Sequence, residues 1–324
     1  MRVTTIFRKS CMPRLSWEGL LLVVLCLSLV WVSGSNAADA RETVVAVFVS
    51  RDIRPYVAAA EGISEVLSES AGISVEVFSL EKIKGKSLDL LLERGEKDGF
   101  VLFIAIGPEA VRMISEKITS GDAAWLYSMI LNPPEVSEAA TGACGVPLDI
   151  PAWKQLDMIG LGLPSVKRLG LLYDPRYNED FFADASARAA DRNLDIIPLP
   201  VSSKKDIPAV LKQHWDNIEA LWLIPDQTVI SESIVQYIIK EALFRDTPVI
   251  GYNRFFYESG AALAFVFDYA EIGRQTGRMA IALLNEGVCE KALPVFQVWR
   301  NIRVINKLGM RVPDNPTPPI EAGP

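Results

Sequence analysis

The chain has 324 residues, enough for two domains of ordinary size with a core in each. Half of the residues are apolar and 23% are charged, as in ordinary globular proteins, and the formal net charge is −7. An acidic chain without a cluster of Lys and Arg offers no electrostatic surface to phosphate backbones, so we exclude nucleic-acid binding.

The N-terminal segment has the order of a secretory signal peptide. Four basic residues within the first fourteen precede the apolar run LLLVVLCLSLVWV, and the small-residue triplets SNA and ADA follow it. As a helix, the thirteen residues from Leu20 to Val32 would span about 20 Å, less than the ~30 Å hydrocarbon core of a bilayer. We therefore predict a signal peptide over residues 1–37 and a periplasmic protein, with a retained single-span anchor as the alternative. Cleavage after Ala37 would remove four of the 33 basic and one of the 40 acidic residues and leave a formal net charge of −10.

Two of the four cysteines, Cys144 and Cys289, lie outside the predicted signal peptide. An exported protein meets an oxidising compartment, in which a disulfide is permitted. Nothing in the sequence brings these two residues together, so we expect two buried thiols, with a disulfide as the alternative.

From residue 43 to residue 130, short β-branched runs alternate with longer amphipathic ones. VVAVFV predicts a buried strand, ISVEVFS a strand nearer the sheet edge and GFVLFIAI a central strand, whereas apolar residues spaced by three and four predict helices. This alternation predicts a parallel sheet with helices on both faces. The expected strands are 44–49, 73–79, 99–106 and 125–130, and the expected helices are one that ends before Gly72, 86–97 and 108–118.

Residues 132–153 interrupt the pattern with four prolines and no sustained period, which predicts a crossover rather than a packed element. The alternation then resumes, so we predict an α/β fold with two doubly wound parallel-sheet lobes. The last residues, from Val312, are rich in proline and predict a loose tail. Beyond residue 153 the expected strands are 166–174, 194–201, 219–226, 247–253, 260–268, 293–299 and 302–306, and the expected helices are 181–193, 204–214, 231–244 and 269–287.

The residues required for catalysis or metal binding do not form a recognisable set. His214, the only histidine, lies among polar residues near the end of a predicted helix, where we expect a solvated side chain. The turn AIGPEA is not a phosphate loop, because Pro108 has no N–H to donate and suits the first position of a helix. We therefore predict no catalytic residues, no metal site and no cofactor, and an exported enzyme remains a minor alternative.

Candidates for ligand binding lie where the predicted strands end, because ligands of doubly wound sheets bind outside the carboxyl ends of the strands. Polar groups and aromatic rings recur there, which suits a site that stacks against and hydrogen-bonds a small molecule. Strand-end Asp and Asn also cap the next helix, and core packing explains several of the aromatics, so both alternatives stay open. The candidates are Ser50, Arg51, Gly107, Pro108, Tyr127, Asp174, Tyr177, Asp226, Gln227, Tyr252, Phe267 and Asp268.

Several segments, in order along nearly the whole chain beyond the signal peptide, resemble one family. They are VFVSRDIRPYVAAAEGI, FIAIGPEAV, TGACGVPLDIPAWKQLDMIGLGLPSVKRLGLLYDP, ALWLIPDQTVI, GAALAFVFDYAEIGRQTGRMA and VINKLGMRVP. In them the chain is similar to the ABC transporter substrate-binding proteins with a periplasmic binding protein type I fold, the group that includes tryptophan- and tyrosine-binding members. Two features depart from the family pattern: Pro108 stands where a hydroxyl residue is common, and the final motif is shortened.

The resemblance implies two lobes joined by a three-crossover hinge, with the ligand in the cleft between them. It adds Tyr173 to the candidate residues and places the second crossover near 264–268 and the third near 296–304. The implied domains are a signal peptide (1–37), an N-terminal lobe (43–132 plus 269–296), a first crossover (133–151), a C-terminal lobe (152–263 plus 297–311) and a flexible tail (312–324).

The resemblance further implies a periplasmic solute-binding component of an ABC importer. Its partners would be a small organic ligand, such as an aromatic amino acid or a related compound, and an ABC permease with its ATPase subunit. Contact with the membrane would run only through the permease. The alternative is a sensing or interaction protein of the cell envelope that kept the fold without a transport role.

Overall fold

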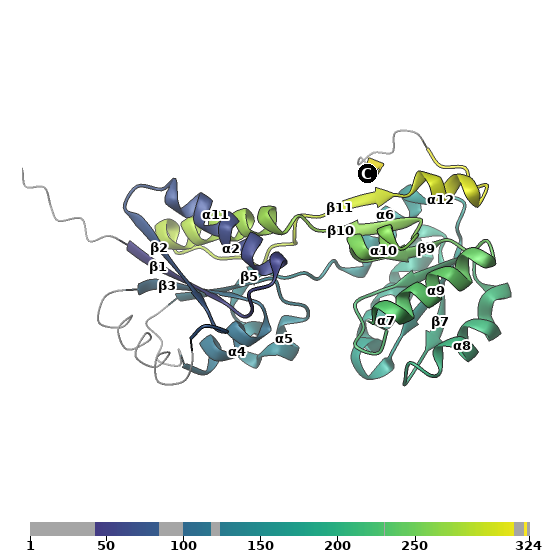
Figure 1. Ribbon diagram of the computed structural model, residues 1–324, viewed down its shortest axis with the longest axis horizontal. Helices are drawn as coiled ribbons and strands as arrows, with labels where there is room; N and C mark the ends of the chain where they lie inside the picture. The colour runs from purple at the N-terminus through teal and green to yellow at the C-terminus, as the bar shows by residue number, and fades with distance from the viewer. Residues whose placement is uncertain (1–42, 84–99, 118–123, 230, 314–320, 323–324) are drawn as a thin grey trace, which may run out of the picture. The chain divides into compact units, whose positions relative to one another are not determined.

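The computed structural model describes residues 43–83, 100–117, 124–229, 231–313 and 321–322 (Figure 1). The predicted signal peptide and the predicted helix at 86–97 lie outside the described residues. The described strands form two sheets, one from the first part of the chain and one from the rest.

The first sheet has five parallel strands, and its strand order places GFVLFIAI at the centre, as predicted. The strands are β1 (Thr43–Val49), β2 (Ile73–Ser79), β3 (Phe100–Ile106), β4 (Ala124–Ser128) and β5 (Cys144–Val146). They lie in the order β2-β1-β3-β4-β5 with parallel pairing throughout. β1 and β3 are apolar and mostly buried on both faces, whereas β2 is partly exposed at the edge.

Among the described residues, three helices cover the two faces of this sheet: α2 (Arg54–Ser68), α4 (Pro108–Lys117) and α11 (Tyr269–Glu286). α2 and α11 bury Ile63, Leu67 and Ile272 against the side of the sheet that carries Val45 and Val47. α4 packs its apolar stripe on the opposite face. Figure 1 shows α11 alongside α2 although the two helices come from opposite ends of the chain.

The second sheet contains all the later strands and joins them in a mixed order. They are β6 (Arg168–Tyr173), β7 (Asp195–Pro200), β8 (Ala220–Leu223), β9 (Val249–Gly251), β10 (Leu263–Val266), β11 (Gln297–Arg300) and β12 (Glu321–Ala322). The order is β12-β11-β10-β9-β8-β6-β7, and the strands from β6 to β10 pair in parallel. β11 runs antiparallel to β10.

Helices cover both faces of the second sheet as well. α6 (Ala152–Gly162), α7 (Pro175–Ala189) and α12 (Ile302–Lys307) share one apolar core, and α8 (Ile207–His214), α9 (Glu232–Phe244) and α10 (Arg254–Glu258) share the other. Trp222 is fully buried in the first of these cores and Phe256 in the second. The structure therefore confirms the predicted α/β class with two doubly wound parallel-sheet lobes.

The expectation that residues 133–151 form only a crossover is wrong. They contain α5 (Pro133–Val136), the 3-10 helix η1 (Glu138–Thr141) and β5, which extends the first sheet by pairing with β4. Short elements of three or four residues leave no periodic signal in a sequence. Residues 147–151 are what remains to connect the first sheet to α6.

The C-terminal region also differs from two expectations. The predicted strand at 302–306 is α12, and Asn301 Oδ1 caps that helix by accepting the Val304 N–H at 3.3 Å. Because β11 and α12 occupy 297–307 and pack with the second sheet, the third passage between the sheets comes before Gln297 and not at 296–304. The predicted tail is not entirely loose: Pro313 O accepts an N–H of Arg300 at 2.7 Å, and β12 pairs with β11.

A disulfide joins Cys144 and Cys289, which corrects the expectation of two thiols. Their Cα atoms are 5.9 Å apart and the residues are 145 positions apart in the sequence. Cys144 begins β5, and Cys289 follows the left-handed turn at Gly287 that ends α11. Lys291 Nζ also donates to Thr141 O at 2.6 Å, so the same segment is held by η1 as well as by the disulfide to β5.

Membrane-spanning helices are not found in the described part of the chain, where no helix combines sufficient length with sufficient apolar character. The predicted N-terminal apolar run lies outside that part.

We predict that loss of the disulfide lowers the free energy of unfolding by about 2 to 5 kcal/mol, because a cross-link that closes so long a loop restricts the unfolded chain. The measurement is urea denaturation of the double variant Cys144→Ser/Cys289→Ser against the oxidised protein. Wild type under reducing agent should match the variant. Free-thiol titration that finds both residues reduced after purification in air would contradict the bridge.

We predict that Gly273→Ala destabilises the protein by about 2 kcal/mol or more, although alanine favours helices. A Cβ at Gly273 would collide with the backbone of Ala59 in α2, so the two helices would have to separate. Gly160→Ala is the matched control: Gly160 also lies inside a helix, nothing stands within 4 Å of its Cβ position, and the change should stabilise by up to ~1 kcal/mol. Thermal denaturation of both variants tests this, and equal effects would refute the packing argument.

Candidate functional site

A cavity of about 610 Å³ lies where segments that follow strands of both sheets meet. Its lining combines aromatic rings, aliphatic side chains and polar groups, the composition usual for small-molecule sites. The lining residues are Leu131, Asn132, Glu135, Leu148, Asp149, Ile150, Pro151, Gln155, Tyr177, Asn178, Asp180, Phe181, Ile224, Pro225, Tyr252, Asn253, Phe267 and Tyr269. A second cavity of about 230 Å³ shares part of this lining and adds Arg112, Val136, Asp226 and Gln227.

Five of the thirteen predicted residues line these cavities. Tyr177, Tyr252 and Phe267 line the larger one, and Asp226 and Gln227 line the smaller one together with Tyr177. The remaining eight line neither cavity: Ser50, Arg51, Gly107, Pro108, Tyr127, Tyr173, Asp174 and Asp268.

The turn at Gly107 and Pro108 satisfies its own polar groups. Gly107 has a φ of 85°, and an added Cβ would lie 2.7 Å from Ser50 Oγ, so only glycine lets β3 turn so closely past β1. Ser50 Oγ accepts the Ala110 N–H at 2.9 Å. Pro108 begins α4, as predicted. This turn holds the first turn of α4 against β1.

Arg51 is committed to a neighbouring acid. Its guanidinium donates to Glu109 Oε1 through two nitrogen atoms, Nε at 3.1 Å and Nη2. Burial raises the pKa of Glu109, but its backbone N–H and Arg51 outweigh burial and lower the pKa overall. The positive charge of Arg51 is therefore neutralised at the end of β1.

Tyr127 and Tyr173 are core residues. Tyr127 is 1% exposed under α4, and burial raises its pKa, followed by a contribution from Asp149. Tyr173 is 3% exposed, stacks on Phe182 with ring centroids 4.9 Å apart, and burial raises its pKa to about 12. These two aromatic rings therefore serve the packing of the core, the alternative that the sequence left open.

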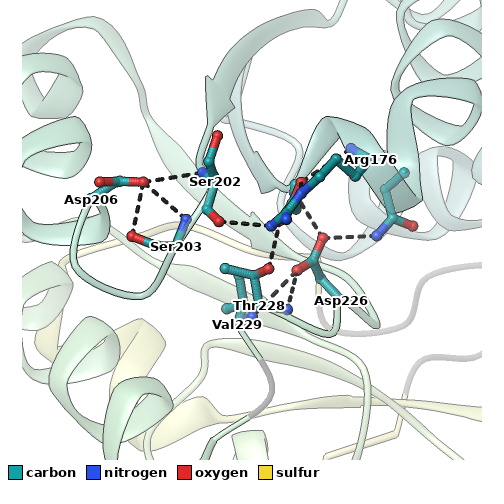
Figure 2. A network of polar contacts seen from close by, with 9 residues as sticks. Arg176, Ser202, Ser203, Asp206, Asp226, Thr228 and Val229 are labelled. Carbon is teal, nitrogen blue, oxygen red and sulfur yellow. Dashed lines mark hydrogen bonds and ion pairs between the residues drawn. The ribbon is translucent and has the colours of Figure 1, made fainter.

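A buried polar network joins the ends of β6 and β8. Asp226 accepts four N–H groups, from the backbone of Asp174 at 2.8 Å, Thr228 at 2.8 Å and Val229 at 3.3 Å, and from Asn178 Nδ2 at 2.8 Å. Figure 2 shows Asp226 at the centre of these contacts. The carboxylates of Asp174 and Asp226 are nearly fully buried, so their hydrogen bonds fix the first turn of α7, which carries Tyr177, and the loop that carries Pro225.

Asp174 is held in the same network by a cation. Its carboxylate accepts from Arg176 and, at 2.6 Å, from Thr228 Oγ1, and it caps α7 through the Arg176 N–H at 3.1 Å. The bond from Arg176 is the largest cause of the strong lowering of the Asp174 pKa. Arg176 also donates to Ser202 O at 2.7 Å. In the adjoining turn, Asp206 Oδ2 accepts the backbone N–H groups of Ser202 and Ser203 (Figure 2).

Capping also describes two other strand-end residues. Asn253 Oδ1 accepts the Phe256 N–H at 3.2 Å and begins α10, and Asp268 Oδ1 accepts the Glu271 N–H at 3.0 Å and begins α11. Tyr252 next to Asn253 packs on Phe256 with ring centroids 4.4 Å apart and lines the larger cavity. Burial raises the pKa of Tyr252, so its hydroxyl stays protonated and can donate a hydrogen bond.

Asp149 is one of the acidic residues of the larger cavity, and the sequence did not single it out. Its Oδ2 accepts the backbone N–H of Asn132 at 2.7 Å. Burial is the main cause that raises its pKa to about 6, the Asn132 N–H opposes this, and the negative charge of Glu135 adds to it. In the described part of the chain, no Lys or Arg forms an ion pair with Asp149. It lies in a proline-flanked loop without period, and pattern reasoning had no signal to find it.

Gln155 forms part of the cavity wall with its polar groups satisfied. Its Nε2 donates to Ile150 O at 2.7 Å and its Oε1 accepts Trp222 Nε1 at 3.2 Å. Phe181 packs edge-on against Trp222 with ring centroids 5.4 Å apart. This side of the cavity is therefore fixed before any ligand arrives.

The described residues contain no group of three His, Cys, Asp or Glu side chains placed to hold a metal ion. His214, which we expected to be solvated, is half-buried, and its Nδ1 is buried without a hydrogen-bond partner among these residues. It lies at the end of α8 and does not line the cavity. The cavity is lined by aromatic rings, carboxylates and amide groups, which can bind a ligand by stacking and by hydrogen bonds.

Residues 118–312, more than half of the chain, match a protein-family model described as ABC transporter substrate binding protein. No curated protein sequence matches this chain. The solved structures it resembles are less than 25% identical, and that likeness concerns the fold.

Three of these structures illustrate the fold. A ligand-free, open substrate-binding protein with adhesive properties from Clostridium difficile is 16% identical, with a TM-score of 0.71 over 87% of this chain and 99% of that one. An ABC domain from Streptococcus pneumonia in complex with L-Trp is 17% identical, with a TM-score of 0.56 over 84% and 96%. A periplasmic ribose ABC transporter protein from Conexibacter woesei is 12% identical, with a TM-score of 0.56 over 83% and 95%.

We predict that Asp149→Asn stabilises the ligand-free protein at pH 8. The pKa of Asp149 rises from 3.8 to about 6 on folding, so above pH 6 the folded state bears the cost of a buried charge that the amide lacks. The gain should be about 1 to 2 kcal/mol, a value that allows for partial solvation of the side chain. As the pH falls from about 6 to about 4, wild type binds its proton in the folded state first, and the gain should disappear.

Chemical denaturation at pH 4 and pH 8 measures this difference. The amide keeps an oxygen that can accept the Asn132 N–H, so the comparison isolates the charge. A variant that is less stable than wild type by the same amount at both pH values would contradict the argument.

Proposed function

Because the chain belongs to the ABC transporter substrate-binding protein family, we propose that it is the periplasmic solute-binding component of an ABC importer. It holds a small organic ligand in the 610 Å³ cavity and presents it to a permease with its ATPase subunit. The single observation that carries this proposal is the cavity itself, which is large enough for a small organic molecule and combines ring faces with polar groups.

The mechanism proposed is closure of the two lobes on the ligand. A ligand shifts the equilibrium toward a closed state only if it binds that state more tightly, and contact with segments of both sheets provides such a difference. The Asp174–Asp226 network fixes the start of α7, which carries Tyr177, and the loop that carries Pro225, so these two segments can act as a rigid wall toward which the opposite segments move.

Aromatic compounds are the ligands that this lining favours. Tyr177, Phe181, Tyr252, Phe267 and Tyr269 line the cavity, and ring faces stack well on other rings. The Streptococcus relative in complex with L-Trp agrees with this class. An aromatic amino acid or a related compound is therefore the proposed class.

A second function is supported by the Clostridium relative, a substrate-binding protein described as having adhesive properties. The second candidate is therefore a sensing or interaction protein of the cell envelope that has this fold without a transport role, and adhesion is an example of such an interaction. Uptake of the identified ligand by cells with and without this gene separates the two functions: transport requires that uptake falls when the gene is deleted.

A thermal-denaturation screen over amino acids, amines, nucleosides, vitamins and sugars tests solute binding. Ligand at about 100 times its Kd should stabilise the protein by about 2.7 kcal/mol, a shift of roughly 5 °C or more for a chain of this size. No shift across the whole panel would contradict the proposed function.

We predict that Tyr177→Ala weakens binding of any ligand found in this way by at least about tenfold, because the ring lines both cavities. Tyr237→Ala is the matched control, since Tyr237 is also a helical tyrosine, is also 37% exposed and lies on α9 outside the cavity. Isothermal titration calorimetry should find the control within twofold of wild type. Equal affinities of the two variants would mean that the ligand binds outside the cavities that Tyr177 lines.

A further inference from the structure

The larger cavity has an unbalanced charge. Three carboxylates line it, those of Glu135, Asp149 and Asp180, and its lining contains no Lys or Arg. Across the described residues, none of the three forms an ion pair. A ligand that enters this cavity therefore meets negative charge only.

Three arginines, Arg51, Arg112 and Arg176, do not correct the imbalance. Arg51 is paired with Glu109, and Arg176 is paired with Asp174 and Ser202 O. Arg112 is exposed and lines only the smaller cavity, together with the carboxylates of Glu135, Asp149 and Asp226. None of them is placed in the larger cavity to receive the carboxylate of a ligand.

Asp149 is the carboxylate whose position is fixed. The Asn132 N–H holds Oδ2, and Asn132 Nδ2 also donates to Glu135, so one residue brings two acids together. Like charges held close, one of them partly buried, cost folding free energy, and binding a cation or taking up a proton recovers it. Tyr127 is the other titratable group that the charge of Asp149 affects.

The aromatic rings of the lining also favour a positively charged ligand. Ring faces carry negative partial charge, and a cation within about 6 Å of a ring centroid is attracted to it, most strongly when water is excluded. Tyr177, Tyr252, Phe267 and Tyr269 provide such rings around the acids. Carboxylates and rings together form the kind of environment that receives an organic ammonium ion.

We propose that the ligand of this cavity is an organic cation that lacks a carboxylate: a compact aromatic or apolar group that bears a protonated amine, which Asp149 receives. This inference rests on the proposed function and narrows its ligand class from aromatic amino acids to aromatic or other apolar amines. A zwitterion would bring a carboxylate into a cavity that already holds three, without a guanidinium or ammonium group to receive it. A neutral sugar would leave the buried charge of Asp149 uncompensated.

The test compares compounds in sets of three that share a ring and differ in whether they carry an ammonium group, a carboxylate or both. Tryptamine is the cation, L-tryptophan the zwitterion and indole-3-propionate the anion, and tyramine, L-tyrosine and 4-hydroxyphenylpropionate form a second set. Calorimetry at pH 8 keeps Asp149 ionised and the amines protonated. We expect the amine to bind at least tenfold more tightly than the zwitterion of its set, and the anion not to bind measurably.

Asp149→Asn tests the residue. The variant should bind the amine roughly ten- to a hundredfold more weakly, the range expected for loss of a charge-assisted hydrogen bond. Asp216→Asn removes the same charge from an exposed residue of the 3-10 helix η3 (Trp215–Asn217), outside the cavity, and should bind as wild type does. Since we expect Asp149→Asn to be more stable than wild type at this pH, weaker binding could not be attributed to unfolding.

The outcomes separate this inference from the proposed function. Tighter binding of a zwitterion, an anion or a monosaccharide than of every amine overturns the inference and leaves solute binding intact. An amine that binds Asp149→Asn as tightly as wild type also overturns it. Binding of no compound from the two sets and the wider panel overturns both.

Discussion

The close packing of α11 against α2 determines how the rest of the molecule is connected. Gly62 and Gly273 let the two helix backbones approach so closely that a Cβ at either position would collide with the opposite helix. This contact brings a late segment back onto the first sheet, after β10 has already joined the second. The chain must then return once more to place β11 beside β10, and it passes between the sheets three times.

The cavity is a consequence of that path. Phe267 and Tyr269 line it because they stand where the chain leaves β10 for α11, and Asp149 and Pro151 line it because they stand where the chain leaves β5 for α6. The Cys144–Cys289 bridge ties the segment that follows α11 to β5, the strand that leads to Asp149. Stability of the scaffold and position of the lining groups therefore come from the same contacts, whereas the charge on Asp149 opposes stability and is best understood through the ligand.

Much of the fold followed from the sequence because period and composition report local burial. The edge position of ISVEVFS, the central position of GFVLFIAI and the end of α11 at Gly287 were all predictable from a few residues. IRVIN was misassigned as a strand because so short an apolar run fits the period of a strand and that of a helix equally well. In the structure, the cap that Asn301 provides starts a helix there. The disulfide could not be predicted, since its two residues meet only through the packing of α11.

The site was predictable only in part, for a physical reason. Strand ends identify where ligands gather, and they pointed to Tyr177, Tyr252 and Phe267, but the same positions serve as helix caps, as Asp174 and Asp268 do. Asp149 matters through burial and through its neighbours Asn132 and Glu135, which depend on the folded loop and leave no pattern in the sequence.

A crystal structure of the protein with the tightest ligand found by screening tests the central claim most directly. The account predicts electron density for the ligand in the 610 Å³ cavity, with a protonated nitrogen within hydrogen-bond distance of an Asp149 oxygen and its apolar part against the aromatic rings. Ligand density outside this cavity, or a ligand that faces Asp149 with an anionic group, would contradict it.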